Sequence, residues 1–504
     1  MMGKRFQLAS LFSDHMIFQA NKPVRLFGVC ENNQSFHITF FDKNYFFKTK
    51  GETFVFELGT YDYVQIPFSF TIASEEEKIT IQDCLIGEVF IASGQSNMQF
   101  IMKDCIEVPI QENPLIRFYE VAKLPFDNAD KEFPYFYFSN EAWYACTKES
   151  TLNFSTIGYL VSNQLYSEMN VPIGIISCNM GDTSVFSWCE YNLLETKVEL
   201  KEFMNQYRQE IAKYESLEKY TQKYNEKLPQ LMNFYGEIEK GIREGLSAEK
   251  SHEDAYKAYP DPYIPMGPRH HNRPAGCFEM MVRKIIPFVS RGVFFYQGES
   301  NHQQVSIYQF GFQAMVESWR DAFKDKNLPF VFVQIAGYSY PGVEELTIAK
   351  LREEQEKCQN PANYIYMVTA ADRGEKDNIH PKDKRDVSKR IADMVMERIF
   401  LKPMNAFSPR LKYAKKGVNQ IVIAFQDNVS NLVTLSKKKL GIYVSKNHVD
   451  FEMCKSVLIE ENRIILKDVQ DIVEIRYAYT SYPLMDFYTI NDLPVLPFRV
   501  LLDK

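Results

Sequence analysis

The stretch GEVFIASGQSNMQF, residues 87–100, joins a run of apolar residues to a polar loop that carries Ser96. The run VFIA is rich in β-branched and aromatic residues, which is typical of a buried strand. From about residue 87 to residue 400, runs of this kind alternate with helical patterns, and the alternation predicts a mainly parallel sheet covered by helices. Ser96 is therefore expected on the loop after a central strand, at the edge where open α/β sheets place their sites.

Short runs of β type flank this central region on both sides. They predict three domains: an N-terminal β-sandwich domain over residues 1–85, an α/β domain over 86–403, and a C-terminal β domain over 404–504. Within the α/β domain, a charged tract over about 192–250 has apolar and tyrosine residues near helical spacing. This tract predicts one or two long amphipathic helices, interpreted as a solvated insertion in preference to an active-site lid.

The composition excludes several classes of protein. The 504 residues include 58 basic and 65 acidic side chains, and the net charge of −7 argues against nucleic-acid or membrane partners, which need clustered positive potential. The sequence shows neither a secretory signal nor a run near the ~20 apolar residues of a membrane span. Nine cysteines are spread singly with no CxxC pair, so a reducing cytoplasm is the expected location.

A serine hydroxyl needs a neighbouring base before it can act as a nucleophile. The stretch DNIHPKDK places Asp377 and His380 three residues apart. In a tight loop this spacing lets the carboxylate orient the imidazole, which leaves its other nitrogen free to act as a base for Ser96. The surroundings of Ser96 are not the GxSxG turn of α/β-hydrolases, because Met98 stands where the last glycine would be.

Two further strand ends offer donors for an oxyanion. GIISCNMGDTS ends an apolar run at Gly181, whose backbone N–H can approach a ligand because no Cβ intervenes. GVFFYQGESN ends another run at Gln297, whose side-chain amide can be a further donor. His270 and His271 are interpreted as a loop pair, since no other ligand type stands at a metal-like spacing beside them.

Four blocks, GEVFIASGQSNM, SCNMGDTSVFSW, FFYQGESN and DNIHPKDK, resemble in sequence and order those of the sialate O-acetylesterase family of SGNH hydrolases. The resemblance extends over nearly the whole chain. It implies a flavodoxin-like α/β/α three-layer catalytic domain between the two β domains. It also implies a serine esterase that removes O-acetyl groups from sugars, with neither metal nor other cofactor.

Carried over by position, the resemblance makes Ser96 the nucleophile, His380 the general base and acid, and Asp377 its orienting carboxylate. The oxyanion would be held by the N–H groups of Ser96 and Gly181 and by Gln297. A group of further residues is expected to contact the substrate or to support these loops: Gln95, Asn97, Glu299, Asn301 and Arg352.

The predicted substrate is an acetylated sugar or oligosaccharide, with 9-O-acetyl sialic acid as the first choice. The chain departs from the family pattern at Asp182, which replaces a glycine, and at Phe186, which replaces a glutamate. These departures keep two alternatives open: an esterase for acetylated xylan or another plant polysaccharide, and a glycan-binding protein without catalysis. The oligomeric state is left open.

Overall fold

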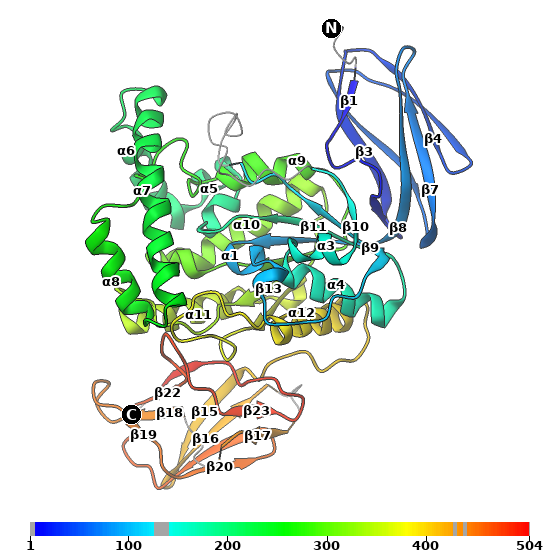
Figure 1. The fold of residues 1–504 in the computed structure, drawn as a ribbon. Coiled ribbons are helices and arrows are strands. Elements are labelled where there is room, and N and C mark those ends of the chain that lie inside the picture. Colours follow the sequence, from blue (N-terminus) through cyan, green and yellow to red (C-terminus); the bar gives the residue numbers. More distant parts are fainter. Residues whose placement is uncertain (1–5, 125–140, 427–430, 437–440, 503–504) are drawn as a thin grey trace.

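The structure is a computed structural model, and it describes residues 6–124, 141–426, 431–436 and 441–502. The outermost residues of the expected terminal domains, 1–5 and 503–504, lie outside the described part. Figure 1 shows a central α/β body with one β region at each end. The three regions follow one another along the chain.

The central sheet has the spatial order β10-β9-β11-β8-β12-β13-β14. All its neighbouring strands are parallel except β10, which pairs antiparallel with β9. Strand β8 lies between β11 and β12, which both follow it in the chain, so the order of the strands reverses at β8. The loops at the carboxyl ends of the strands on its two sides lead in opposite directions, which leaves room for a site. The bounds are β8 Lys78–Gly94, β9 Asn113–Glu120, β10 Tyr144–Cys146, β11 Ile173–Asn179, β12 Gly292–Tyr296, β13 Phe330–Gln334 and β14 Ile365–Thr369.

Helices cover this sheet in pairs. Helix α4 packs on α12, and the two contact β9, β11, β13 and β14, while α10 packs on α11. Strands β11, β12, β13 and β14 are buried along their whole length, which explains why their sequences are continuous apolar runs and not alternating ones. The bounds of the helices are α1 Ser96–Gln99, α3 Lys148–Leu152, α4 Thr156–Met169, α5 Tyr191–Thr196, α9 Arg283–Ile285, α10 Tyr308–Phe323, α11 Glu345–Cys358 and α12 Arg385–Arg398.

The N-terminal region consists of two sheets. One has the order β1-β3-β6, and the other joins β5, β4 and β7 to the first half of β8, which also pairs with β2. The boundary expected at residue 85 therefore falls inside a continuous strand. The bounds are β1 Phe6–Leu8, β2 Ile17–Gln19, β3 Pro23–Cys30, β4 Ser35–Phe40, β5 Lys43–Lys48, β6 Thr53–Thr60 and β7 Val64–Ala73.

A buried carboxylate ties this region to the central sheet. Glu88, in the middle of β8, accepts hydrogen bonds from Gln19 Nε2 at 2.8 Å and from the Tyr63 hydroxyl at 2.7 Å. It also forms an ion pair with Arg291, with Nε 2.6 Å from the carboxylate. Since a buried charge is tolerated only when it is paired and hydrogen-bonded, Glu88 fixes how the first β region meets β8.

The expected insertion is helical. It contains α6 Lys201–Ile211, α7 Leu217–Arg243 and α8 Ala248–Ala258, so it extends beyond the predicted tract. Tyr220, Tyr224, Leu228 and Leu231 of α7 pack with Ile264 into a small core of their own. Figure 1 shows these helices along one side of the central body.

The C-terminal region has its own hydrophobic core, separate from that of the central sheet. Its strands form two four-stranded sheets, β15-β16-β21-β20 and β19-β18-β22-β24, and the pair β17-β23. The bounds are β15 Leu411–Gly417, β16 Gln420–Phe425, β17 Leu432–Thr434, β18 Ile442–Ser445, β19 Glu452–Met453, β20 Val457–Glu460, β21 Arg463–Lys467, β22 Glu474–Tyr477, β23 Phe487–Thr489 and β24 Phe498–Leu501.

Candidate active site

Ser96 begins helix α1 directly after β8, where the sheet reverses direction. Gly94 makes this turn possible, because its φ of +123° is a conformation that side chains disfavour and a Cβ there would lie 2.1 Å from the Tyr296 carbonyl oxygen. As the first helical residue, Ser96 has a backbone N–H without an intrahelical partner. The nucleophile predicted from the sequence is thus half-buried at the carboxyl end of the central strand.

The loop that carries His380 lies against the Ser96 loop. Asn97 Nδ2 donates a hydrogen bond to the Ile379 carbonyl oxygen at 3.1 Å, and the rings of Phe100 and His380 have centroids 6.5 Å apart. The His380 backbone N–H donates to Asn378 Oδ1 at 3.0 Å, which shapes the tight loop that also contains Asp377. Within the described residues no hydrogen bond joins the Ser96 hydroxyl to the His380 ring, and such bonds often form only with substrate bound.

A buried lysine that the sequence analysis did not single out completes this contact. Lys384 is 2% exposed, and its ammonium donates to Asn97 Oδ1 at 2.5 Å and lies 4.8 Å from the Phe100 ring centroid. Burial lowers the pKa of Lys384 to about 7. Burial, and then the charge of Lys384, lower the pKa of His380 to about 4. His380 is therefore neutral at pH 7, as a general base must be.

Of the predicted oxyanion donors, Gly181 is close to Ser96. A Cβ built on Gly181 would lie 3.5 Å from Ser96 Cβ, and the Gly181 N–H donates to Gln99 Oε1 at 2.8 Å. The Gln99 side chain thus holds an acceptor oxygen on this donor, which is the chemical role that a substrate carbonyl oxygen would take.

Gln297 is buried and engaged within the protein. Its Nε2 has three acceptors: Asn301 Oδ1 at 2.6 Å, the Thr183 carbonyl oxygen at 3.0 Å and Gln95 Oε1 at 3.2 Å. An amide nitrogen has two hydrogens, so Gln297 can donate to an oxyanion only if it releases these partners. Gln297 Oε1 and Asn301 Nδ2 are both buried without a hydrogen-bond partner.

The other predicted residues connect the loops to one another. Gln95 Oε1 accepts from the N–H groups of Gly298 and Ser300, at 3.2 and 3.4 Å. Glu299 Oε1 accepts from Asn97 Nδ2 at 2.6 Å, and burial raises the pKa of Glu299. Asn301 Oδ1 accepts from the Val185 N–H at 2.9 Å. These side chains fix the positions of the loops after β8, β11 and β12 relative to one another.

Arg352 lies outside this cluster. It is 1% exposed, and its guanidinium donates to four backbone carbonyl oxygens, those of Ile335, Ala336, Thr480 and Ser481, at 2.8 to 3.0 Å. Arg352 therefore joins the loop after β13 to the C-terminal region.

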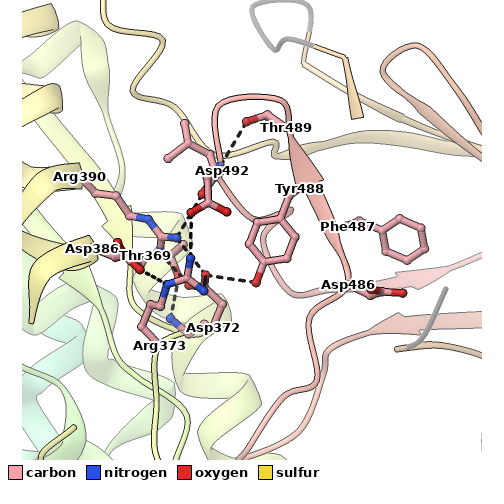
Figure 2. A network of polar contacts seen from close by, with 12 residues as sticks. Thr369, Asp372, Arg373, Asp386, Arg390, Asp486, Phe487, Tyr488, Thr489 and Asp492 are labelled. Atoms are coloured by element: carbon pink, nitrogen blue, oxygen red, sulfur yellow. Dashed lines mark hydrogen bonds and ion pairs between the residues drawn. The ribbon is translucent and has the colours of Figure 1, made fainter. Parts of the chain in front are cut away.

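A polar network anchors the start of the histidine loop to the C-terminal region (Figure 2). Asp372, just after β14, is paired with Arg390 of α12 at 2.6 Å and with Arg373 at 3.1 Å, and it accepts from the Tyr488 hydroxyl at 3.3 Å. Arg373 also donates to Asp492 at 3.0 Å. The chain that leads to His380 is thus held from both the α/β body and the C-terminal region.

The described residues contain neither a metal-binding group of side chains nor a helix that could span a membrane. In residues 6–124, 141–426, 431–436 and 441–502, no group of three or more His, Cys, Asp or Glu side chains could hold a metal ion. His270 and His271 stack on each other, with ring centroids 4.4 Å apart. No helix among the described residues is long and apolar enough to cross a membrane.

Comparison with known proteins gives a consistent result. Residues 269–397 match the family described as "Carbohydrate esterase, sialic acid-specific acetylesterase". The sialate O-acetylesterases of Mus musculus and Homo sapiens are 22% identical to this chain over 345 and 353 residues. Each match covers 64% of this chain, and they cover 58% of the mouse protein and 56% of the human protein.

A solved carbohydrate acetylesterase from Xanthomonas citri has the same fold, with a TM-score of 0.76 over 98% of this chain and 99% of that chain, at 21% identity. The family match and these relatives point to the same family as the sequence motifs, and the solved structure shows the fold. The chain spans less than two thirds of the length of the mammalian relatives that it matches.

Proposed function

We propose that this chain is a carbohydrate esterase that hydrolyses O-acetyl esters of sugars, with Ser96, His380 and Asp377 as its catalytic residues. The main support is the hydrogen bond from Asn97 to the Ile379 carbonyl oxygen, two residues that are 282 positions apart in sequence. This bond holds the Ser96 loop against the histidine loop. The similarity to carbohydrate esterases supports the reaction class.

In the proposed reaction, His380 takes the proton of the Ser96 hydroxyl as its oxygen attacks the acetyl carbonyl. The N–H groups of Ser96 and Gly181 then stabilise the oxyanion, after the carbonyl oxygen has displaced Gln99 from Gly181. His380 returns the proton to the departing sugar oxygen, which leaves an acetyl group on Ser96. Water, activated by the same histidine, releases acetate and restores the serine.

The names of the curated relatives point to O-acetyl sialic acid as substrate, and that is the first candidate. A neutral acetylated sugar, such as those of plant polysaccharides, is the second. The specific observation behind the second candidate is the exposed carboxylate of Asp182 beside the nucleophile, because it would repel an anionic sugar.

The proposal is tested with Ser96→Ala and an aryl acetate, whose hydrolysis requires no sugar recognition. We expect the loss of the nucleophile to lower kcat by roughly 10⁴-fold or more. Ser167→Ala, which truncates an exposed serine on α4, is the matched control and should behave as wild type. Full activity in the Ser96 variant would refute the mechanism. Mass spectrometry of quenched wild-type protein should show one acetyl group on the peptide that contains Ser96.

A further inference from the structure

Asp182 presents a carboxylate next to the nucleophile. It follows Gly181, the residue that approaches Ser96, and its φ of +54° is in the left-handed region. Its side chain is 54% exposed, although Ser300 Oγ donates to it at 3.3 Å and His271 Nε2 lies 3.5 Å away. A carboxylate has about four lone-pair positions, so Asp182 can accept further hydrogen bonds from a ligand.

The helical insertion brings tyrosines to the same place. Tyr235, from α7, interacts through its hydroxyl with Asp182, and desolvation together with the charge of Asp182 raises the pKa of Tyr235. Burial, and then the hydrogen bond with Tyr256, raise the pKa of Tyr263, and the charge of Asp182 adds a smaller contribution in the same direction. The hydroxyls of Tyr256 and Tyr263 are 2.8 Å apart. Residues more than 50 positions apart in sequence thus meet beside the loop that follows β11.

These rings are held in place but not covered. Tyr235, Tyr256 and Tyr263 are 37%, 42% and 47% exposed, whereas Phe234 beneath them is fully buried. The Phe234 ring centroid lies 4.8 Å from that of Tyr256 and 5.7 Å from that of Tyr263. Exposed aromatic surface beside a few fixed polar groups is typical of a small-molecule site.

We propose that Asp182, Tyr235, Tyr256 and Tyr263 form the subsite that binds the sugar of the acetyl ester, and that this sugar is a neutral pyranose. The inference rests on the esterase function proposed above, and it selects the second of the two candidate substrates over the first. The pyranose hydroxyls donate to Asp182, while the apolar ring face covers the tyrosines. A sugar carboxylate, as in sialic acid, is disfavoured because Asp182 carries the same charge. The insertion is then part of the substrate site and more than a solvated appendage.

The test compares kcat/KM for acetylated xylo-oligosaccharides, an O-acetyl sialic acid and an aryl acetate. Wild type should prefer the neutral sugar ester over the sialic acid ester. Asp182→Asn removes a charged acceptor, so kcat/KM for the neutral sugar ester should fall about tenfold more than for the aryl acetate. The same variant should reduce the preference for the neutral over the anionic ester.

Tyr263→Ala should raise KM for the xylo-oligosaccharide more than it lowers kcat. Its matched control is Tyr413→Ala, which removes a tyrosine of similar exposure, 43%, from the C-terminal region. The inference is overturned if Asp182→Asn lowers all three activities by one common factor, or if wild type prefers the sialic acid ester.

Failure of the proposed function gives a different result, namely no serine-dependent turnover of any ester, the aryl acetate included. In that case calorimetry of the acetylated xylo-oligosaccharide with Ser96→Ala and with Ser96→Ala/Asp182→Asn still tests the subsite. Binding that the second substitution weakens about tenfold supports the subsite, and equal or absent binding contradicts it.

Discussion

Burial and the neighbouring Lys384 together determine the protonation of His380, which the proposed mechanism uses as its base. Burial and the positive charge of Lys384 lower the pKa of His380 to about 4, so the neutral imidazole persists well below its ordinary value of 6.5. We therefore expect kcat/KM for an aryl acetate to decline only as the pH approaches 4. In Lys384→Gln an amide donor is kept while the charge is lost. The acid limb of this profile should then move to higher pH.

The control for this shift is Lys389→Gln, which removes a lysine that is 63% exposed on α12. Its acid limb should coincide with that of wild type, and an equal shift in both variants would exclude a local effect of Lys384.

The low pKa of His380 also affects the stability of the protein, because between the two pKa values the unfolded chain binds a proton at His380 and the folded protein does not. The free energy of unfolding should fall as the pH drops from 6.5 towards 4.

At the scale of single elements, helix α10 packs against Phe186, one of the two residues that depart from the family pattern. Phe186 is fully buried, and a Cβ on Gly311 of α10 would lie 2.4 Å from its ring. We expect Gly311→Ala to overpack this contact and lower the free energy of unfolding by about 1 to 3 kcal/mol in urea titrations. The ring and the loop after β11 would have to move to accommodate the methyl group.

Gly236→Ala is the matched control, because Gly236 lies in α7 and a Cβ there meets no atom within 4 Å. Alanine is a better helix former than glycine by about 0.5 to 1 kcal/mol, so this variant should be slightly more stable than wild type. If both substitutions were stabilising, the close contact between Phe186 and α10 would not restrict the size of residue 311.

The elements around Ser96 show which features the sequence could predict and which it could not. The apolar run before Ser96 and the loop of Asp377 and His380 are local patterns, and the structure places Ser96 after the central strand with the histidine loop against it. The contact of Tyr235 with Asp182 and that of Lys384 with Asn97 join distant segments, and no local spacing encodes them. The sequence did not predict that β8 continues across the expected boundary, because its first half pairs with β7 of the N-terminal region and its second half with β12 of the α/β body.

At the scale of the whole molecule, the C-terminal region is coupled to the histidine loop through the network of Figure 2. The Asp372 side chain is 1% exposed and that of Arg390 is 5% exposed, and they form two hydrogen bonds at 2.6 and 2.9 Å. Breaking a buried ion pair by removing one charge leaves the other uncompensated. Asp372→Asn should therefore lower the free energy of unfolding by about 3 to 5 kcal/mol.

Asp383→Asn serves as the comparison, because Asp383 pairs with Arg385 at 2.6 Å on the surface, with both side chains more than 40% exposed. Exposed pairs contribute at most about 1 kcal/mol, so this variant should unfold close to wild type. Asp372 also binds Tyr488 and lies eight residues before His380, so Asp372→Asn should loosen the loop and lower kcat for an aryl acetate. Equal stability of the two variants would mean that the C-terminal region is attached through Arg352 and its carbonyl partners instead.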